Sequence, residues 1–163
     1  MLSVGALYPG SAVAAHAQAP RCTTRQLEIT VHGDDGGLGH GSEQLWFRNR
    51  GRPCTLHGYP RVLLLDRHGH IVGRARKTDF GYQGGLQEGP VPVIRLGRGQ
   101  VANAMVEGMN SGTKLKPCPH YVAYRVTPPG GIGSVRVPTG TFCQTQVHPV
   151  VPGEQQIYPS VHD

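Results

Sequence analysis

Long apolar runs are missing from this chain, and so are the breaker-free windows that helices need. No stretch approaches the roughly 18 consecutive apolar residues of a membrane-spanning helix. The 163 residues include 24 glycines and 14 prolines, and no window without them carries apolar residues at helical spacing. These absences exclude a transmembrane segment and a helical core. They predict one mostly β domain.

Familiar catalytic motifs are also missing. The chain contains no G-x-S-x-G elbow, no P-loop and no H-E-x-x-H helix. Ser111 and Lys114 match the S-x-x-K pattern of acyl-transfer enzymes, but that motif opens a helix, whereas Gly112 and its surroundings predict a loop. We therefore expect no catalytic residue, no cofactor and no enzymatic activity.

The four cysteines are far apart and form no C-x-x-C pair. Zinc ligands come in close pairs, so their spacing argues against a zinc site and, with an even count, favours disulfides. Cys22 and Cys143 each directly precede a predicted strand, and the first and last strands of a sandwich can lie side by side. Although four cysteines allow three connectivities, we predict that Cys22 pairs with Cys143 and Cys54 with Cys118.

The first 20 residues are mostly small or apolar and carry no Asp, Glu, Lys or Arg, and an Ala-x-Ala pattern typical of a signal-peptide cleavage site stands at residues 15–17 or 17–19. They look like the end of a secretory signal peptide whose basic start is missing. The expected organisation is a signal-like segment at 1–20, a β-sandwich domain at 21–151 and a flexible tail at 152–163. The protein is expected to be secreted or in the cell envelope. The alternative is a disordered cytosolic tail at the N-terminus.

Short extended segments separated by turns make up the rest of the chain. Leu27, Ile29 and Val31 alternate with polar residues, as in a half-buried strand. The Asp66–Gly69 turn between two apolar segments is typical of a hairpin. The overall pattern predicts an all-β sandwich of seven to nine short strands. The candidate strands are residues 26–31, 44–49, 61–66, 70–75, 91–96, 100–107, 120–127, 134–137 and 144–150.

One stretch carries a resemblance to a known family. Asn49 to Pro60 reads N-x-G-x-x-C-x-L-x-G-Y-P, and an apolar strand and the Asp66–Gly69 turn follow it. With the flanking strands, these residues resemble a family of secreted actinobacterial proteins catalogued as a domain of unknown function, over residues 22–150. The resemblance implies an immunoglobulin-like β-sandwich with two disulfides and no established reaction.

The unusual residues of this stretch have structural explanations. Asn49 and Gly51 tolerate the positive φ of a tight turn, and Cys54 ties that turn to another strand. Tyr59, between a glycine and a proline, is expected to form a corner whose ring covers the edge of the core. The alternative is that Tyr59 stacks on a ligand.

The net charge is +6, and thirteen of the sixteen basic residues are arginine. Such a surface attracts anionic partners by a long-range effect that salt screens. The long connection at residues 74–92 places cations next to aromatic rings, which suits stacking and anion contacts. The alternative is a mobile insertion that folds back onto the sandwich. The candidate binding residues are Arg74, Arg76, Lys77, Phe80 and Tyr82.

We expect a non-catalytic interaction module of the cell envelope, whose partner is an anionic glycan or lipid or a secreted protein. Nucleic acid is not expected, because the basic residues are spread along the chain and the protein is expected to be secreted. The alternative function is a small extracytoplasmic metal-binding or enzymatic protein that uses surface histidines. His68 and His70 would form its H-x-H pair. The further candidate ligands are His40, His57, His120 and His148.

Overall fold

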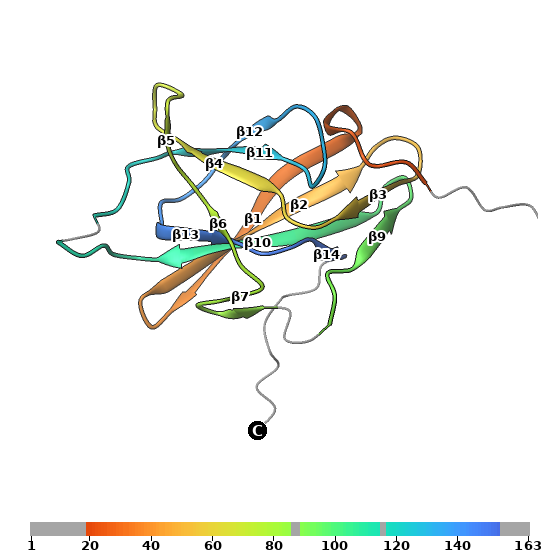
Figure 1. The fold of residues 1–163 in the computed structure, drawn as a ribbon. Helices are drawn as coiled ribbons and strands as arrows, with labels where there is room; N and C mark the ends of the chain where they lie inside the picture. Colours follow the sequence, from red (N-terminus) through yellow and green to blue (C-terminus); the bar gives the residue numbers. More distant parts are fainter. Residues whose placement is uncertain (1–18, 86–88, 115–116, 154–163) are drawn as a thin grey trace, which may run out of the picture.

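Two β-sheets packed face to face form the body of the protein (Figure 1). The computed structural model describes residues 19–85, 89–114 and 117–153. Within these ranges the helical structure is one turn of 3-10 helix at Thr24–Gln26, and no helix is long and apolar enough to cross a membrane. The predicted all-β sandwich is confirmed.

The larger sheet has six strands, and its neighbours are antiparallel except for one parallel pair, β13 with β6. Its order in space is β1 (Leu27–Gly37), β2 (His40–Asn49), β10 (Val101–Met109), β13 (Cys143–Val147) and β6 (Arg76–Lys77), with β14 (Val151–Pro152) added to β10.

The smaller sheet has four antiparallel strands. Their order in space is β12 (Val135–Pro138), β11 (Ala123–Thr127), β4 (Arg61–Leu65) and β5 (Ile71–Arg74). Two further antiparallel pairs join β3 (Cys54–His57) to β9 (Val93–Leu96), and β7 (Phe80–Gly81) to β8 (Gly84–Gly85).

The core lies between the two sheets because alternate residues of each strand are apolar and point inward. In β4 the inward residues are Val62 and Leu64, whereas Leu63 between them is half-buried on the opposite face. Burying each such side chain contributes about 1.5–3 kcal/mol. The other core residues of the central strands are Leu45, Phe47, Ala102, Ala104, Val106, Tyr124, Val126 and Val147.

All nine predicted strands correspond to strands of the structure, whereas β3, β6, β7, β8 and β14 were not predicted. The predicted hairpin at Asp66–Gly69 joins β4 to β5, and Gly69 has the positive φ of 84° that its turn requires. Asp66 Oδ1 accepts hydrogen bonds from the amides of His68 and His70, at 2.8 and 2.9 Å. Burial raises the pKa of the Asp66 carboxyl, but these hydrogen bonds outweigh it and hold the pKa below its usual value.

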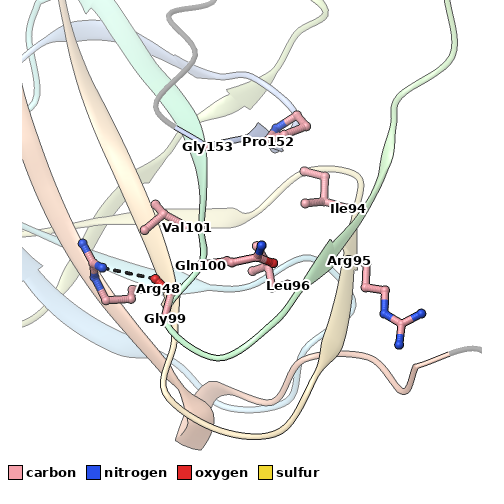
Figure 2. Close-up of a pocket in the computed structure, with 9 residues that line it drawn as sticks. All are labelled: Arg48, Ile94, Arg95, Leu96, Gly99, Gln100, Val101, Pro152 and Gly153. Carbon is pink, nitrogen blue, oxygen red and sulfur yellow. Dashed lines mark hydrogen bonds between the residues drawn. The ribbon is translucent and has the colours of Figure 1, made fainter.

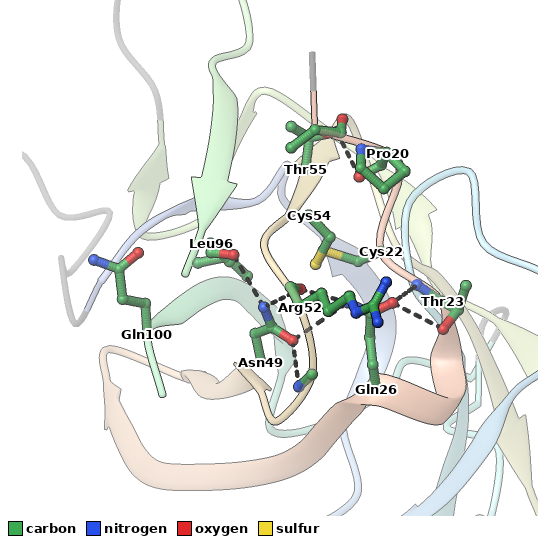
Figure 3. Close-up of a disulfide and its surroundings, with 12 residues drawn as sticks. Pro20, Cys22, Thr23, Gln26, Asn49, Arg52, Cys54, Thr55, Leu96 and Gln100 are labelled. Atoms are coloured by element: carbon green, nitrogen blue, oxygen red, sulfur yellow. Dashed lines mark hydrogen bonds between the residues drawn. A yellow bond between two sulfur atoms is a disulfide. The ribbon is translucent and has the colours of Figure 1, made fainter. Parts of the chain in front are cut away.

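The side chain of Asn49 ties the end of β2 to two other segments (Figure 3). Its amide nitrogen donates to the carbonyls of Arg52 and Leu96, and its oxygen accepts from Gly51 N and Gln26 Nε2. Neither Asn49 nor Gly51 has a positive φ, so the explanation predicted for them is wrong. The four hydrogen bonds of its side chain explain an asparagine at position 49, and Gly51 is needed because a Cβ there would lie 2.9 Å from Gln26 Cβ.

Replacing Asn49 by alanine should therefore lower the free energy of unfolding by about 2–3 kcal/mol, because buried backbone groups lose their partners. Denaturant titration with the disulfides intact measures the loss. The matched control is Asn110→Ala, since Asn110 is exposed and such changes usually stay within about 0.5 kcal/mol. Equal losses in the two variants would contradict the structural role of Asn49.

All four cysteines form disulfides, but the predicted pairing is wrong. Cys22 bonds to Cys54 and Cys118 to Cys143, with Cα–Cα distances of 4.9 and 4.5 Å. The prediction assumed that the first and last strands are neighbours, whereas β1 lies at the sheet edge beside β2, and β13 lies between β10 and β6. Cys22 instead reaches β3, where its amide donates to the Thr55 carbonyl at 2.9 Å.

The predicted segments at the chain ends are largely outside the described residues. Of the signal-like segment 1–20, only residues 19 and 20 are described, and of the tail 152–163, only residues 152 and 153. Pro152 belongs to β14, and the amide of Gly153 donates to the Val101 carbonyl at 2.9 Å. The organisation predicted for these segments stays a prediction.

Candidate functional site

The predicted binding loop is not an unstructured connection in its described part. Its first residues carry the chain from the smaller sheet to the larger one: Arg74 ends β5, and Arg76 and Lys77 form β6 beside β13. Ala75 between them is buried, and its amide donates to the Val62 carbonyl at 2.9 Å. Arg74, Arg76 and Lys77 are therefore held by backbone pairing in both sheets.

The next part of this segment is a hairpin that lies over a buried carboxylate. β7 and β8 cover the face of β10 that points away from the core, where Glu107 is fully buried. Glu107 accepts hydrogen bonds from the amides of Tyr82 and Gln83, both at 2.8 Å, and lies 2.9 Å from His148 Nε2.

Glu107 and His148 anchor this hairpin. Both side chains have an exposed fraction of 0%, so no solute can reach them while the hairpin is in place. Three partners satisfy the carboxylate, as a buried charge requires. Gly81 and Gly85 allow the close approach, since a Cβ on Gly81 would lie 1.3 Å from Glu107 Oε1.

Among the described residues, the aromatic rings of the predicted loop make no cation–π contact with the cations of that loop. Phe80 is exposed, and Tyr82 stacks on His40 with ring centroids 4.8 Å apart. The ring that meets a cation is Tyr59, whose centroid lies 5.6 Å from Lys77 Nζ. Burial and a hydrogen bond with Asp79 raise the pKa of the Tyr59 hydroxyl to about 12.

A hollow of about 490 Å³ opens where β5 leaves the smaller sheet. Arg61, Arg74, Arg76 and Lys77 line it together with apolar residues of β4. The lining does not include Phe80 or Tyr82. The structure therefore brings together the three cations that the sequence singled out, adds Arg61, and leaves the two predicted rings outside.

The outer face of the smaller sheet carries a row of arginines that the sequence did not single out. Arg136 on β12 is paired with Arg125 on β11, Arg125 with Leu63 on β4, and Leu63 with Arg74 on β5. Directly paired residues of neighbouring strands point to the same face of a sheet. We call Arg136, Arg125 and Arg74, with Leu63 between them, the arginine row.

The arginine row faces solvent because the residues on either side of its members point into the core. Tyr124 and Val126 flank Arg125 and are buried, and Val137 beside Arg136 is also buried. Arg74 and Arg136 are exposed, and Arg125 is half-buried.

Arg61 lies two residues before Leu63 on β4, so its side chain is on the same face of the sheet, where its Nη2 donates to Thr127 Oγ1 at 3.2 Å. Arg61, Leu63 and Arg74 belong to both the hollow and this face.

Two arginines directly opposite each other on neighbouring strands repel, which costs stability. Within the described ranges, no carboxylate lies within salt-bridge distance of Arg61, Arg74, Arg125 or Arg136. An uncompensated positive field of this kind raises the local concentration of anions. The guanidinium groups also match phosphate and carboxylate oxygens in a two-point geometry.

A second hollow, of about 440 Å³, lies between β9 and the start of β10 (Figure 2). Its two arginines are less suited to hold an anion. Arg48 donates to the Gly99 carbonyl at 3.2 Å and lies 3.9 Å from the Glu28 carboxylate. Figure 2 shows that the side chain of Arg95 points away from the other lining residues.

The histidines are dispersed, and several ring nitrogens already have partners. Arg67 Nε donates to His68 Nε2 at 2.9 Å, and His70 Nδ1 lies 3.3 Å from Asp66 Oδ2. His68 and His120 line a third hollow, of about 740 Å³. In the part of the chain that the structure describes, no three His, Cys, Asp or Glu residues are grouped to hold a metal ion.

Ser111 and Lys114 lie in an exposed, non-helical segment after β10. The S-x-x-K motif of acyl-transfer enzymes needs the start of a helix, which presents the lysine to the serine. The described part of this segment does not provide that geometry.

Comparison with known proteins identifies a family without assigning an activity. No curated protein matches the chain, and no solved structure matches it. Residues 22–153, which contain both disulfides and all fourteen described strands, match the family model described as "Domain of unknown function (DUF4232)". The chain therefore belongs to this family of domains of unknown function.

Proposed function

We propose that this protein is a non-catalytic, secreted module of the cell envelope that binds an anionic envelope component through the arginine row and the adjoining hollow. The observation that carries the proposal is the direct pairing of Arg125 with Arg136 on an open sheet face. Repulsion between the two arginines lowers the stability of the fold, and natural proteins tolerate such destabilising arrangements most often at functional sites.

The proposed location is supported by the cysteines. All four are in disulfides, and disulfides persist in oxidising compartments outside the cytoplasm. The proposed mode of binding is supported by the rigidity of the face. Arg125 and Arg136 sit on paired strands, so little backbone order has to be gained when a ligand binds.

Co-sedimentation with protein-free cell-wall sacculi that keep their anionic polymers tests the function. Removing two contacts to the polymer with Arg125→Ala/Arg136→Ala should weaken binding by about tenfold at low salt and flatten its salt dependence. The variant should keep or slightly raise its melting temperature, because the repulsion between the two arginines is relieved.

The matched control is Arg95→Ala/Arg98→Ala, which removes the same charge from exposed residues outside the arginine row. We expect this control to weaken binding by less than about twofold, through net charge alone. Equal weakening in the two variants would show that the row is not the site. Undiminished binding to sacculi stripped of their anionic polymers would show that the ligand is not anionic.

A further inference from the structure

We infer that the ligand of the arginine row is a linear polymer with phosphate groups in its backbone, bound by several phosphates at once. This inference rests on the proposed function and names the class of its ligand. Three features carry it: the length of the row, the chemistry of its side chains, and the absence of exposed rings from the four strands.

The length of the row favours a polymer over a single anion. Neighbouring strands lie about 4.8 Å apart, so a row from β12 to β5 covers roughly 14 Å. A single phosphate reaches at most two neighbouring arginines over this span. Beyond Arg74 the arginine row is continued by Arg76 and Lys77 of β6, which line the hollow; we call the row and these two residues together the cationic track. An extended chain can follow this track and meet all of its cations, and each contact after the first is intramolecular.

The side chains of the row favour phosphate. Each guanidinium can donate two parallel hydrogen bonds to one phosphate, and a phosphodiester keeps its charge at every physiological pH. Leu63 interrupts the charges between Arg125 and Arg74. It offers an apolar contact to the short carbon linkers that separate phosphates in a polyol phosphate chain.

The smaller sheet lacks a platform for bases or sugar rings. Tyr124 is the one aromatic residue on its four strands, and its exposed fraction is 0%. Proteins that bind single-stranded nucleic acid stack its bases on exposed aromatic rings, each worth about 1–3 kcal/mol. A polymer recognised by its phosphates alone needs no such ring, so the face suits a base-free phosphate chain better than a nucleic acid.

Titration calorimetry on the full chain with soluble probes tests this inference. The probes are orthophosphate, tripolyphosphate, long-chain polyphosphate, poly(glycerol phosphate), polygalacturonate and oligo(dT). Affinity per molecule should rise by at least about a hundredfold from orthophosphate to the long phosphate chains, because each added contact releases counterions. The two long phosphate chains differ in their linkers, so tighter binding of poly(glycerol phosphate) would assign a role to Leu63.

Two double variants locate the chain on the row. Arg125→Ala/Arg136→Ala should weaken the long phosphate chains about tenfold and leave tripolyphosphate, which we expect to bind in the hollow, within about twofold. Arg74→Ala/Arg76→Ala should weaken both. Each variant should reduce the slope of log affinity against log salt by about 1.4, if each lost contact contributes about 0.7 as in single strands.

The outcomes separate this inference from the proposed function. Orthophosphate binding as tightly as the long chains would overturn the polymer and leave an anion site. Equal or tighter binding of oligo(dT) or polygalacturonate would overturn the phosphate-backbone class. Binding to sacculi without binding to either phosphate polymer would overturn this inference alone. Absence of binding both to the sacculi and to the phosphate polymers would overturn the proposed function as well.

Discussion

Replacing Gly81 by alanine should detach the β7–β8 hairpin and lower the free energy of unfolding by about 3–5 kcal/mol, the range found when a buried charge loses its partner. The new Cβ would lie 1.3 Å from Glu107 Oε1 and 2.8 Å from His148 Nε2. Glu107 is fully buried and cannot move aside without losing its contacts to the hairpin amides and to His148. Denaturant titration measures the loss.

Hydrogen exchange separates this effect from general destabilisation. The amides of Tyr82 and Gln83 should exchange slowly in the parent and fast in the variant, because both donate to Glu107. Gly37→Ala is the matched control, since a Cβ at Gly37 would have no heavy atom within 4 Å. Slow exchange at both amides in Gly81→Ala would show that Glu107 does not anchor the hairpin.

Removing the Cys22–Cys54 disulfide with a double alanine substitution should lower the free energy of unfolding by about 3–4 kcal/mol, as expected for a loop of this length. The bond closes a separation of 32 residues. It also holds the segment before β1 against β3, where Thr55 N donates to the Pro20 carbonyl at 2.8 Å. Thermal unfolding without reductant measures the change.

The single variant Cys22→Ala tests the connectivity itself. Alkylation followed by peptide mapping should find the free thiol at Cys54, the partner of Cys22 in the structure. A free thiol at Cys143 would instead support the pairing that the sequence favours. The double variant should also show faster exchange at the Thr55 amide than at the core of the smaller sheet.

Much of the fold was predictable because alternation of apolar residues is a local property. Alternation predicted the strand at 26–31, and the turn at Asp66–Gly69 between two apolar segments predicted the hairpin of β4 and β5. β6, β7 and β8 were not predictable, because two-residue strands are too short to show a period. The disulfide pairing depends on which strands are neighbours, and alternation within one strand carries no information about its neighbours.

The site was predictable only where its residues are close in sequence. Arg74, Arg76 and Lys77 stand together and were found, whereas Arg125 and Arg136 meet Arg74 only through the strand order β12, β11, β4 and β5. Alternation does place Arg125 on the outer face, between the inward Tyr124 and Val126, but it does not show what lies beside it. Glu107 was missed for a related reason, since its partners include backbone amides of a distant hairpin.

The order of the disulfides along the chain has a consequence for biosynthesis. The first bond joins Cys22 to Cys54 and the second joins Cys118 to Cys143, so the two loops neither overlap nor enclose one another. Chains are synthesised from the N-terminus, and domains fold as they emerge. An oxidase that joins each new thiol to the preceding unpaired one produces the native pattern directly. Pairing of the cysteines in their order of synthesis therefore reaches the native connectivity without isomerisation of a non-native bond.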